Sequence, residues 1–301
     1  MILVTGAAGL SGSAIVSRCV TQGIVVRALV RNAKAASHIA GHGVDIVEGD
    51  MADPETLGRA LAGVDRALMI SSANGRMEET QCTFIDACKR FGVRHVVKFS
   101  GAEDGFDPEA FVFTAMHERI EDYLERSGLA WTHLRPSQFM QVYLREARTI
   151  VESDELRLPL GGIELAPVDI ADVAAVAVEI LRTGGHDGHS YMMTGPEALT
   201  GNDIAGSIGA ARDRAVRYVS ITPERRRDDL LAAGAPAYFA DGIRDQALER
   251  LKHPRAKIHL ETHCRFGIIP TRFGDFAKRH AAQFAGEPQP APRHLINRPR
   301  V

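Results

Sequence analysis

The chain has 301 residues, 45% of them apolar and 25% charged, which is the composition of an ordinary globular protein. Its formal net charge of −2 gives no electrostatic basis for binding nucleic acid or a membrane surface, and no apolar run is long enough to span a bilayer. The four cysteines include no C-x-x-C pair, so the sequence predicts neither a disulfide framework nor a metal site. We expect a soluble, cytoplasmic protein that is a monomer or a homodimer.

The first twelve residues, MILVTGAAGLSG, predict a phosphate-binding turn. A short apolar strand, Ile2–Val4, leads into three glycines, and a helical pattern follows. Gly6 suits the tight turn, Gly9 lets the backbone approach a pyrophosphate, and Gly12 lets the helix pack closely on the strand. The N–H groups and the positive dipole end of that helix would face the phosphates. Further contacts in the same turn are expected from Thr5, Ala8 and Leu10.

Apolar runs of strand length alternate with helical patterns through the first half of the chain. Strands are expected at Ile2–Val4, Val25–Val30, Asp45–Val47, Arg66–Ile70, His95–Phe99 and Trp131–Leu134. Helices are expected at Ser11–Gln22, Pro54–Leu61, Glu78–Phe91 and Phe111–Ser127. This alternation is typical of an α/β fold with a Rossmann-type, doubly wound parallel sheet. Left-handed helix ends are predicted at Gly23, Gly43, Gly63, Gly92 and Gly128.

The second half is less regular and predicts a small C-terminal α+β substrate lobe. Its helices are expected at Asp169–Leu181, Thr200–Ala211, Pro223–Ala233, Pro236–Leu251 and Thr271–Phe284, and its strands at Ser190–Met193 and Val216–Ser220. We assign residues 1–155 to a nucleotide-binding domain whose core strands continue to about 195, residues 156–285 mainly to the lobe, and residues 286–301 to a flexible tail.

Two charged stretches of the second half predict no chemistry. Arg225-Arg226-Arg227 is interpreted as a solvated helix face, because two aspartates follow it directly. His259, His263 and Cys264 have the residue types of metal ligands, but no fourth ligand has a suitable spacing. We therefore expect this second stretch to lie at the surface.

Two cations follow the second expected strand. An acidic residue near this position binds the ribose 2′-hydroxyl in NAD sites, whereas Arg31 and Lys34 suit a 2′-phosphate. The pattern therefore favours NADP(H) over NAD(H), unless both cations are solvated surface charges. After the third strand, Asp50 and its neighbour Met51 are expected beside the adenine, unless Asp50 is a turn or helix-capping residue.

Several longer motifs resemble the NmrA-like branch of the atypical short-chain dehydrogenase/reductase superfamily over about residues 2–284. They are TGAAGLSG at 5–12, LVRN at 29–32, EGDMAD at 48–53, VVKFSGA at 96–102, SGLAWTHLRPSQFMQ at 127–141, PVDIADVAAVA at 167–177 and YMMTGPEALTGNDIA at 191–205. The glycine turn is shared with many proteins, whereas SGL-x-x-T-x-LRP and TGPE-x-LT are more specific. The resemblance points to NADPH-dependent quinone reductases, triphenylmethane reductases and their redox-sensing relatives.

The resemblance implies the catalytic positions. Classical members use a serine, and a tyrosine four residues before a lysine that lowers its pKa and binds the nicotinamide ribose. Ser100 matches the serine and His117 the lysine, which leaves Phe113, without a proton to donate, at the tyrosine position. We therefore expect Ser100 and His117 to be catalytic, with His117 also contacting the ribose. The alternatives are a strand-end cap for Ser100 and a solvent-facing His117.

The rest of the site is implied in the same way. Ser71 and Ser72 are expected on the ribose side of the cofactor, and Pro136 beside the nicotinamide. Walls of the substrate pocket are expected from Gly101, Phe113, Phe139, Met140 and Tyr143. Ordinary core packing is the alternative for the apolar side chains among them. The glycine-punctuated stretch 101–108 is a candidate lid.

These features imply an NADPH-dependent oxidoreductase that reduces a quinone-like or polycyclic aromatic small molecule by direct hydride transfer. Such a reaction does not need the tyrosine, because hydride addition gives a delocalised anion or, from a cationic dye, a neutral product. Two alternatives stay open. One is an aromatic-polyketide tailoring enzyme, an oxygenase or a reductase, on the same fold, and the other is a non-catalytic NAD(P)-sensing regulator of the NmrA type.

Overall fold

The computed structural model describes residues 1–101, 111–254 and 256–287. The described chain divides into two compact units, which are treated separately below. Unit one comprises residues 1–101, 114–135 and 173–192, and unit two comprises the remaining described residues. The expected lid at 101–108 lies almost wholly outside the described residues, as does the expected tail from residue 288 onward.

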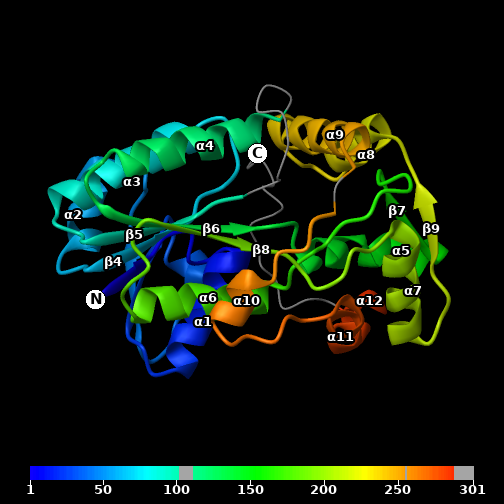
Figure 1. Cartoon of the computed structure of the whole chain (residues 1–301), viewed down its shortest axis with the longest axis horizontal. Coiled ribbons are helices and arrows are strands. Elements are labelled where there is room, and N and C mark those ends of the chain that lie inside the picture. The colour runs from blue at the N-terminus through cyan, green and yellow to red at the C-terminus, as the bar shows by residue number, and fades with distance from the viewer. Residues whose placement is uncertain (102–110, 255, 288–301) are drawn as a thin grey trace. The chain divides into compact units, whose positions relative to one another are not determined.

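A seven-stranded sheet with the order β3-β2-β1-β4-β5-β6-β8 forms the centre of unit one (Figure 1). Its strands are β1 (Ile2–Val4), β2 (Val26–Val30), β3 (Val44–Glu48), β4 (Arg66–Met69), β5 (His95–Phe99), β6 (Ala130–Pro136) and β8 (His189–Met193). The strand pairs from β3 to β6 are parallel, and Val4 lies between Ala28 and Leu68. The strand order therefore changes direction at β1, between β2 and β4, as in a doubly wound fold. In such folds ligands bind beyond the carboxyl ends of the strands at this switch point.

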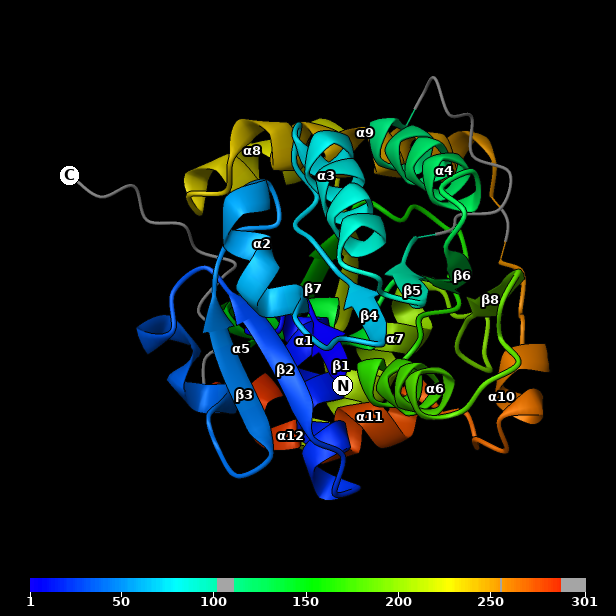
Figure 2. The ribbon, with the colours of Figure 1, turned by 90° about the vertical axis from the view of Figure 1, so that its left-hand side faces the viewer.

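Helices cover both faces of the sheet (Figure 2). One face carries α1 (Leu10–Thr21) and α6 (Ile170–Arg182), and the other carries α2 (Pro54–Leu61), α3 (Met77–Arg90) and α4 (Val112–Glu125). The start of α2 shows the local cause, because the Asp53 carboxylate accepts a hydrogen bond from the Glu55 amide at 3.1 Å and proline opens the helix. The predicted Rossmann-type fold is confirmed, and the five predicted helix-end glycines all have φ between 69° and 89°.

Unit two contains a second set of helices and strands. They are η2 (Met140–Glu146), α5 (Ala147–Ser153), β7 (Glu155–Leu158), α7 (Gly201–Arg212), β9 (Arg217–Ser220), α8 (Pro223–Ala232), α9 (Ala237–Lys252), α10 (Glu261–Arg265), α11 (Phe273–Arg279) and α12 (Ala281–Phe284). Strands β7 and β9 pair in parallel, with Leu156 opposite Tyr218. The apolar core lies between η2, α5, α7, α11 and α12, and includes the fully buried Ile204 and Phe276. Among the described residues, no helix combines the length and the apolar character needed to cross a membrane.

The secondary structure differs from the sequence analysis in two places. The segment 140–158 contains η2, α5 and β7, none of which was predicted, because its strand is completed only by β9, about sixty residues later in the chain. The single helix expected at 271–284 is two helices, because His280 leaves the helical conformation at φ −110° and ψ 19°. Phe276 and Phe284, one on each side of this break, are both fully buried in the same core.

Replacing Gly206 with alanine should stabilise the protein. Gly206 is exposed on α7, and a Cβ there would meet nothing within 4 Å. Glycine inside a helix costs about 0.5–1 kcal/mol relative to alanine, so we expect the free energy of unfolding to rise by about that amount in a urea titration followed by circular dichroism. Gly209→Ala on the same helix is the control, because its Cβ would lie 3.0 Å from the Val216 amide nitrogen. An equal gain in both variants would contradict the packing argument.

Candidate nucleotide-binding and active site

Two of the N-terminal glycines, Gly6 and Gly12, lie where the turn leaves no room for a side chain. Gly6 has φ +56°, and a Cβ on it would lie 2.9 Å from the Ile70 carbonyl oxygen. A Cβ on Gly12 would lie only 2.2 Å from the Gly6 carbonyl oxygen. Gly9 precedes α1 with extended backbone angles, and no side chain of the described chain caps this helix start. Backbone segments of the turn therefore pack closely against one another where β1 ends, which is the arrangement that a phosphate-binding turn requires.

Thr5 holds this turn in place. Its side chain is fully buried, and its hydroxyl donates a 2.7 Å hydrogen bond to the Ile70 carbonyl and accepts one of 2.7 Å from the Ile70 amide. These bonds join the end of β1 to the end of β4 at the switch point. Thr5 therefore supports the cradle through its position, while the partly buried Ala8 and Leu10 lie on the turn and helix start themselves.

The expected adenine side of the site has exposed cations and a well-defined turn. Arg31 and Lys34 are exposed after β2, at the start of the short helix η1 (Lys34–Ile39). The Ala33 amide between them donates to the Glu48 carboxylate at 3.3 Å, so one acidic group also stands near this loop. Asp50 accepts a hydrogen bond from the Ala52 amide at 2.9 Å, the geometry of a turn residue. Its neighbour Met51 is buried.

The residues after β4 combine an exposed and a buried polar group. Ser72 is exposed, whereas the Ser71 hydroxyl accepts a 2.8 Å hydrogen bond from the side-chain amide of Gln81 on α3. Gln81 is almost fully buried, and its other side-chain atom, Oε1, makes no hydrogen bond within the described residues. A buried acceptor without a partner costs free energy, so its retention is consistent with a ligand at this edge.

A buried lysine that the sequence analysis did not identify lies at the centre of unit one. Lys98 on β5 is fully buried, and its Nζ lies 2.8 Å from Nδ1 of His117 on α4. Burial lowers the pKa of Lys98 to about 7. Burial and then the charge of Lys98 lower the pKa of His117 well below its usual value. The available signal was a lysine inside the apolar run VVKF of a strand buried on both faces, where lysine almost never occurs without a partner.

The far side of the His117 ring faces the carboxyl end of β5. A Cβ on Gly101 would lie 3.4 Å from Nε2 of His117, so this nitrogen lies close to the backbone that follows Ser100. The Ser100 hydroxyl is buried close to the Glu121 carboxyl, and this contact helps to lower the pKa of Glu121. The two predicted catalytic residues therefore lie near the same strand end, and both remain candidates.

A second buried charge pair borders this centre. Glu121 on α4 accepts a hydrogen bond from Arg135 Nε at 3.1 Å and a second one from Arg135 Nη2. Burial alone would raise the pKa of Glu121. The hydrogen bonds from Arg135 and the electrostatic interaction with His133 outweigh this effect, so the pKa lies below its usual value. Glu121 is thus a buried carboxylate held in its charged form.

The remaining predicted pocket residues lie in unit two and are mostly packed against its own side chains. Phe113 contacts the rings of Phe111 and Tyr238, each at a centroid distance of 5.6 Å, and a Cβ on Gly242 would lie 2.4 Å from its ring. Met140 and Tyr143 are fully buried in the core, Pro136 is buried, and Phe139 is half-buried. These positions match the core-packing alternative, and their role as pocket walls stays a prediction.

Two expectations about surface stretches need correction. Arg226 is not a solvated side chain, because it binds the buried carboxylate of Glu146 in two places, one of them at 3.2 Å. His263 is not at the surface either, since it is fully buried with Nε2 3.8 Å from the Asp172 carboxylate. In both cases the charged partner, Glu146 or Asp172, lies far away in the sequence. No metal-binding group of three or more ligands occurs among the described residues.

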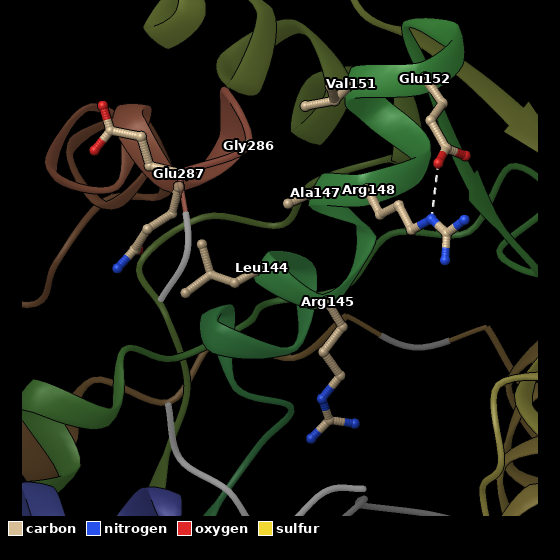
Figure 3. A pocket seen from close by; sticks show the side chains of 9 residues that line it. Leu144, Arg145, Ala147, Arg148, Val151, Glu152, Gly286 and Glu287 are labelled. Atoms are coloured by element: carbon tan, nitrogen blue, oxygen red, sulfur yellow. Dashed lines mark hydrogen bonds and ion pairs between the residues drawn. The ribbon is translucent and has the colours of Figure 1, made fainter. Parts of the chain in front are cut away.

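A cavity of about 380 Å³ lies in unit two, beside α5 and the residues after α12 (Figure 3). Leu144 and Ala147 line it, whereas Arg145 points away from the other labelled side chains and Arg148 is paired with Glu152 at 2.7 Å. None of the predicted site residues lines this cavity. Because it shares no residue with the predicted site, we do not assign it as the active site.

Comparison with known proteins identifies the class. The profile of the NmrA-like family matches residues 1–255, and the chain belongs to this family. It is 35% identical over 286 residues to an NAD(P)H azoreductase of Xenophilus azovorans, which covers 94% of this chain and 99% of the relative.

Two further similarities come from a sequence and from a solved structure. The chain is 33% identical, over 95% of its length and 100% of the relative, to a (4-alkanoyl-5-oxo-2,5-dihydrofuran-3-yl)methyl phosphate reductase of Streptomyces griseus. The fold matches an Escherichia coli NADPH-dependent quinone oxidoreductase in complex with NADPH with a TM-score of 0.82 and 25% identity, covering 93% of this chain and 99% of the other.

Proposed function

We propose that this protein is an NADPH-dependent reductase that transfers a hydride to a conjugated, electron-poor acceptor such as a quinone or an aromatic azo compound. The observation that carries this proposal is the glycine cradle at the switch point, in the same unit as the Lys98–His117 pair. The names of the similar proteins support it, because azo, quinone and butenolide acceptors are all conjugated systems that accept a hydride.

The residues present fit a dinucleotide. A Cβ at Gly6 or Gly12 would come within 3 Å of a neighbouring backbone atom, so glycine is required at both positions. This is the type of turn that brings backbone amides close to a pyrophosphate. In this proposal the cradle holds the pyrophosphate, Arg31 and Lys34 bind the 2′-phosphate, and Ser71 and Ser72 face the ribose. When bound, NADPH supplies the hydride. The protein contributes position and exclusion of water.

The proposed acceptor class follows from the residue at the position of the usual tyrosine. Phe113 stands where classical relatives have an acidic tyrosine, so simple carbonyl reduction lacks its usual proton donor. A quinone or azo compound spreads the added charge over its conjugated system, which lowers the demand for a strong acid in the transition state. Lys98 and His117 supply titratable groups beside Gly101.

A panel assay tests the proposed function. The purified protein is incubated with NADPH and, in separate reactions without oxygen, a benzoquinone, an aromatic azo dye and a cationic triarylmethane dye. We expect acceptor-dependent loss of NADPH with at least one of them. Binding of NADPH without any turnover would overturn the proposal in favour of a nucleotide-sensing regulator. Turnover of an electron-rich aromatic only in the presence of oxygen would favour an oxygenase.

Replacing Arg31 with alanine tests the 2′-phosphate assignment. Charge-assisted hydrogen bonds are worth about 1.5–3 kcal/mol, so we expect NADPH to bind about 10- to 100-fold more weakly while NADH binding changes little. Titration calorimetry with both nucleotides measures this. Arg126→Ala, which removes an exposed arginine just after α4, is the control. Equal losses for NADPH and NADH in Arg31→Ala would refute the assignment.

A further inference from the structure

Resting on the proposed function, we propose that Lys98 and His117 form a proton relay that delivers a proton to the acceptor as it receives the hydride. In this relay His117 Nε2 is the donor and Lys98 is a positioning residue that also replaces the donated proton. The pair thus takes over a task for which the chain has no tyrosine at the usual position.

The geometry of the pair determines which nitrogen of His117 carries the proton. A charged lysine has only donors, so across the 2.8 Å contact Lys98 Nζ donates and His117 Nδ1 accepts. The proton of the neutral imidazole must then lie on Nε2. This nitrogen is the one on the Gly101 side, at the carboxyl end of β5, where ligands of doubly wound sheets bind.

The surroundings of Lys98 favour a relay over a permanent charge. Burial lowers its pKa to about 7, Glu121 on α4 opposes this, Arg135 on β6 adds to it, and Cys82 on α3 opposes it weakly. His117 is held neutral by burial and by the charge of Lys98. Because an imidazolium is disfavoured here, loss of the Nε2 proton must be matched by gain of a proton at Nδ1. Lys98 can supply that proton near neutral pH.

The step balances in protons and electrons. The acceptor gains two electrons with the hydride, which NADPH supplies under the proposed function. As the new O–H or N–H bond of the acceptor forms, the Nε2–H bond of His117 breaks and Nδ1 takes a proton from the Lys98 ammonium. His117 ends neutral in its other tautomer and Lys98 ends as a neutral amine. Water then returns one proton to the pair.

Cationic triarylmethane dyes provide an internal comparison. Hydride addition to their central carbon gives a neutral product, so no proton is required, whereas a quinone or azo compound needs one. In Lys98→Met we expect the ratio of kcat for the quinone to kcat for the dye to fall about 100-fold, within the usual range for a general acid. Lys89→Met, which removes an exposed lysine of α3, should leave the ratio unchanged. An unchanged ratio in Lys98→Met would overturn the relay.

¹⁵N NMR of the histidine rings tests the pair without any substrate or cofactor. In the unmodified protein, His117 should be the Nε2–H tautomer below about pH 7 and should change its ring shifts as Lys98 titrates near that pH, since the lysine then becomes able to accept from Nδ1. The signal is assigned by its loss in His117→Gln. A His117 signal without this step would overturn the inference, even if Lys98→Met did not fold. If the step is present but no acceptor is reduced, the proposed function fails and the pair stands.

Discussion

Gly12→Val is expected to abolish productive NADPH binding, raising Kd by about 100-fold or more, which corresponds to about 2.8 kcal/mol. The cause is steric, because a Cβ at this position would lie 2.2 Å from the Gly6 carbonyl oxygen and 2.8 Å from the Ala7 Cα. Both neighbours are backbone and cannot rotate away, so α1 must move away from β1. The amides at the start of α1 then leave the cradle. Titration of the purified variant with NADPH measures the loss.

The control for this experiment is another glycine of unit one. Gly41 lies after η1, and a Cβ there would meet nothing within 4 Å. Gly41→Ala should therefore bind NADPH like the unmodified protein. Circular dichroism shows whether Gly12→Val still folds, since overpacking typically costs only about 1–3 kcal/mol. A folded Gly12→Val that keeps its affinity would show that the glycine turn does not hold the cofactor.

Lys98→Met is expected to change how stability depends on pH. The pKa of Lys98 is about 7 in the folded protein, against 10.5 ordinarily, so between these values the unfolded chain binds a proton that the folded protein does not. Stability of the unmodified protein relative to Lys98→Met should therefore rise with pH across this window. One proton gives at most about 1.4 kcal/mol per pH unit, or about 2 kcal/mol between about pH 7 and pH 8.5.

Urea unfolding of both proteins at several pH values measures this difference. Below about pH 7 both states of the unmodified protein carry the charge, and the difference between the two proteins should level off at its lowest value. Lys89→Met replaces an exposed lysine, so its free energy of unfolding should change with pH in parallel with that of the unmodified protein. Parallel curves for Lys98→Met as well would mean that Lys98 does not titrate near neutral pH.

The sequence alone predicted most of unit one, because its signals are local. Apolar runs and helix-end glycines mark its strands and α-helices within a few residues, although the short helix η1 was not predicted. For example, the expected strand Arg66–Ile70 is β4, Arg66–Met69. The structure of unit two depends more on contacts between residues that are far apart in the sequence. The residues of β7 form a strand by pairing with β9, and the partly buried Arg226 pairs with the buried Glu146.

The candidate site likewise has a part that the local sequence predicts and a part that depends on contacts between distant residues. Its glycine turn occupies twelve consecutive residues and could be recognised directly, and the family resemblance placed Ser100 and His117. Lys98 escaped notice because its significance comes from a contact with His117 on another element. A lysine within an apolar strand can be recognised in the sequence, but the sequence does not show which side chain it contacts. For Met140 and Tyr143 a pattern of apolar residues could not separate a pocket wall from a packed core.

An anaerobic single-turnover experiment tests most directly whether this protein moves a hydride from NADPH to a conjugated acceptor. NADPH is bound to an excess of the protein and mixed rapidly with a benzoquinone in the absence of oxygen, while the absorbance of the reduced nicotinamide and of the quinone is followed. We predict that both fall together, one NADPH for each quinone, and faster than without the protein. Bound NADPH that stays reduced with every acceptor of the panel would contradict the account.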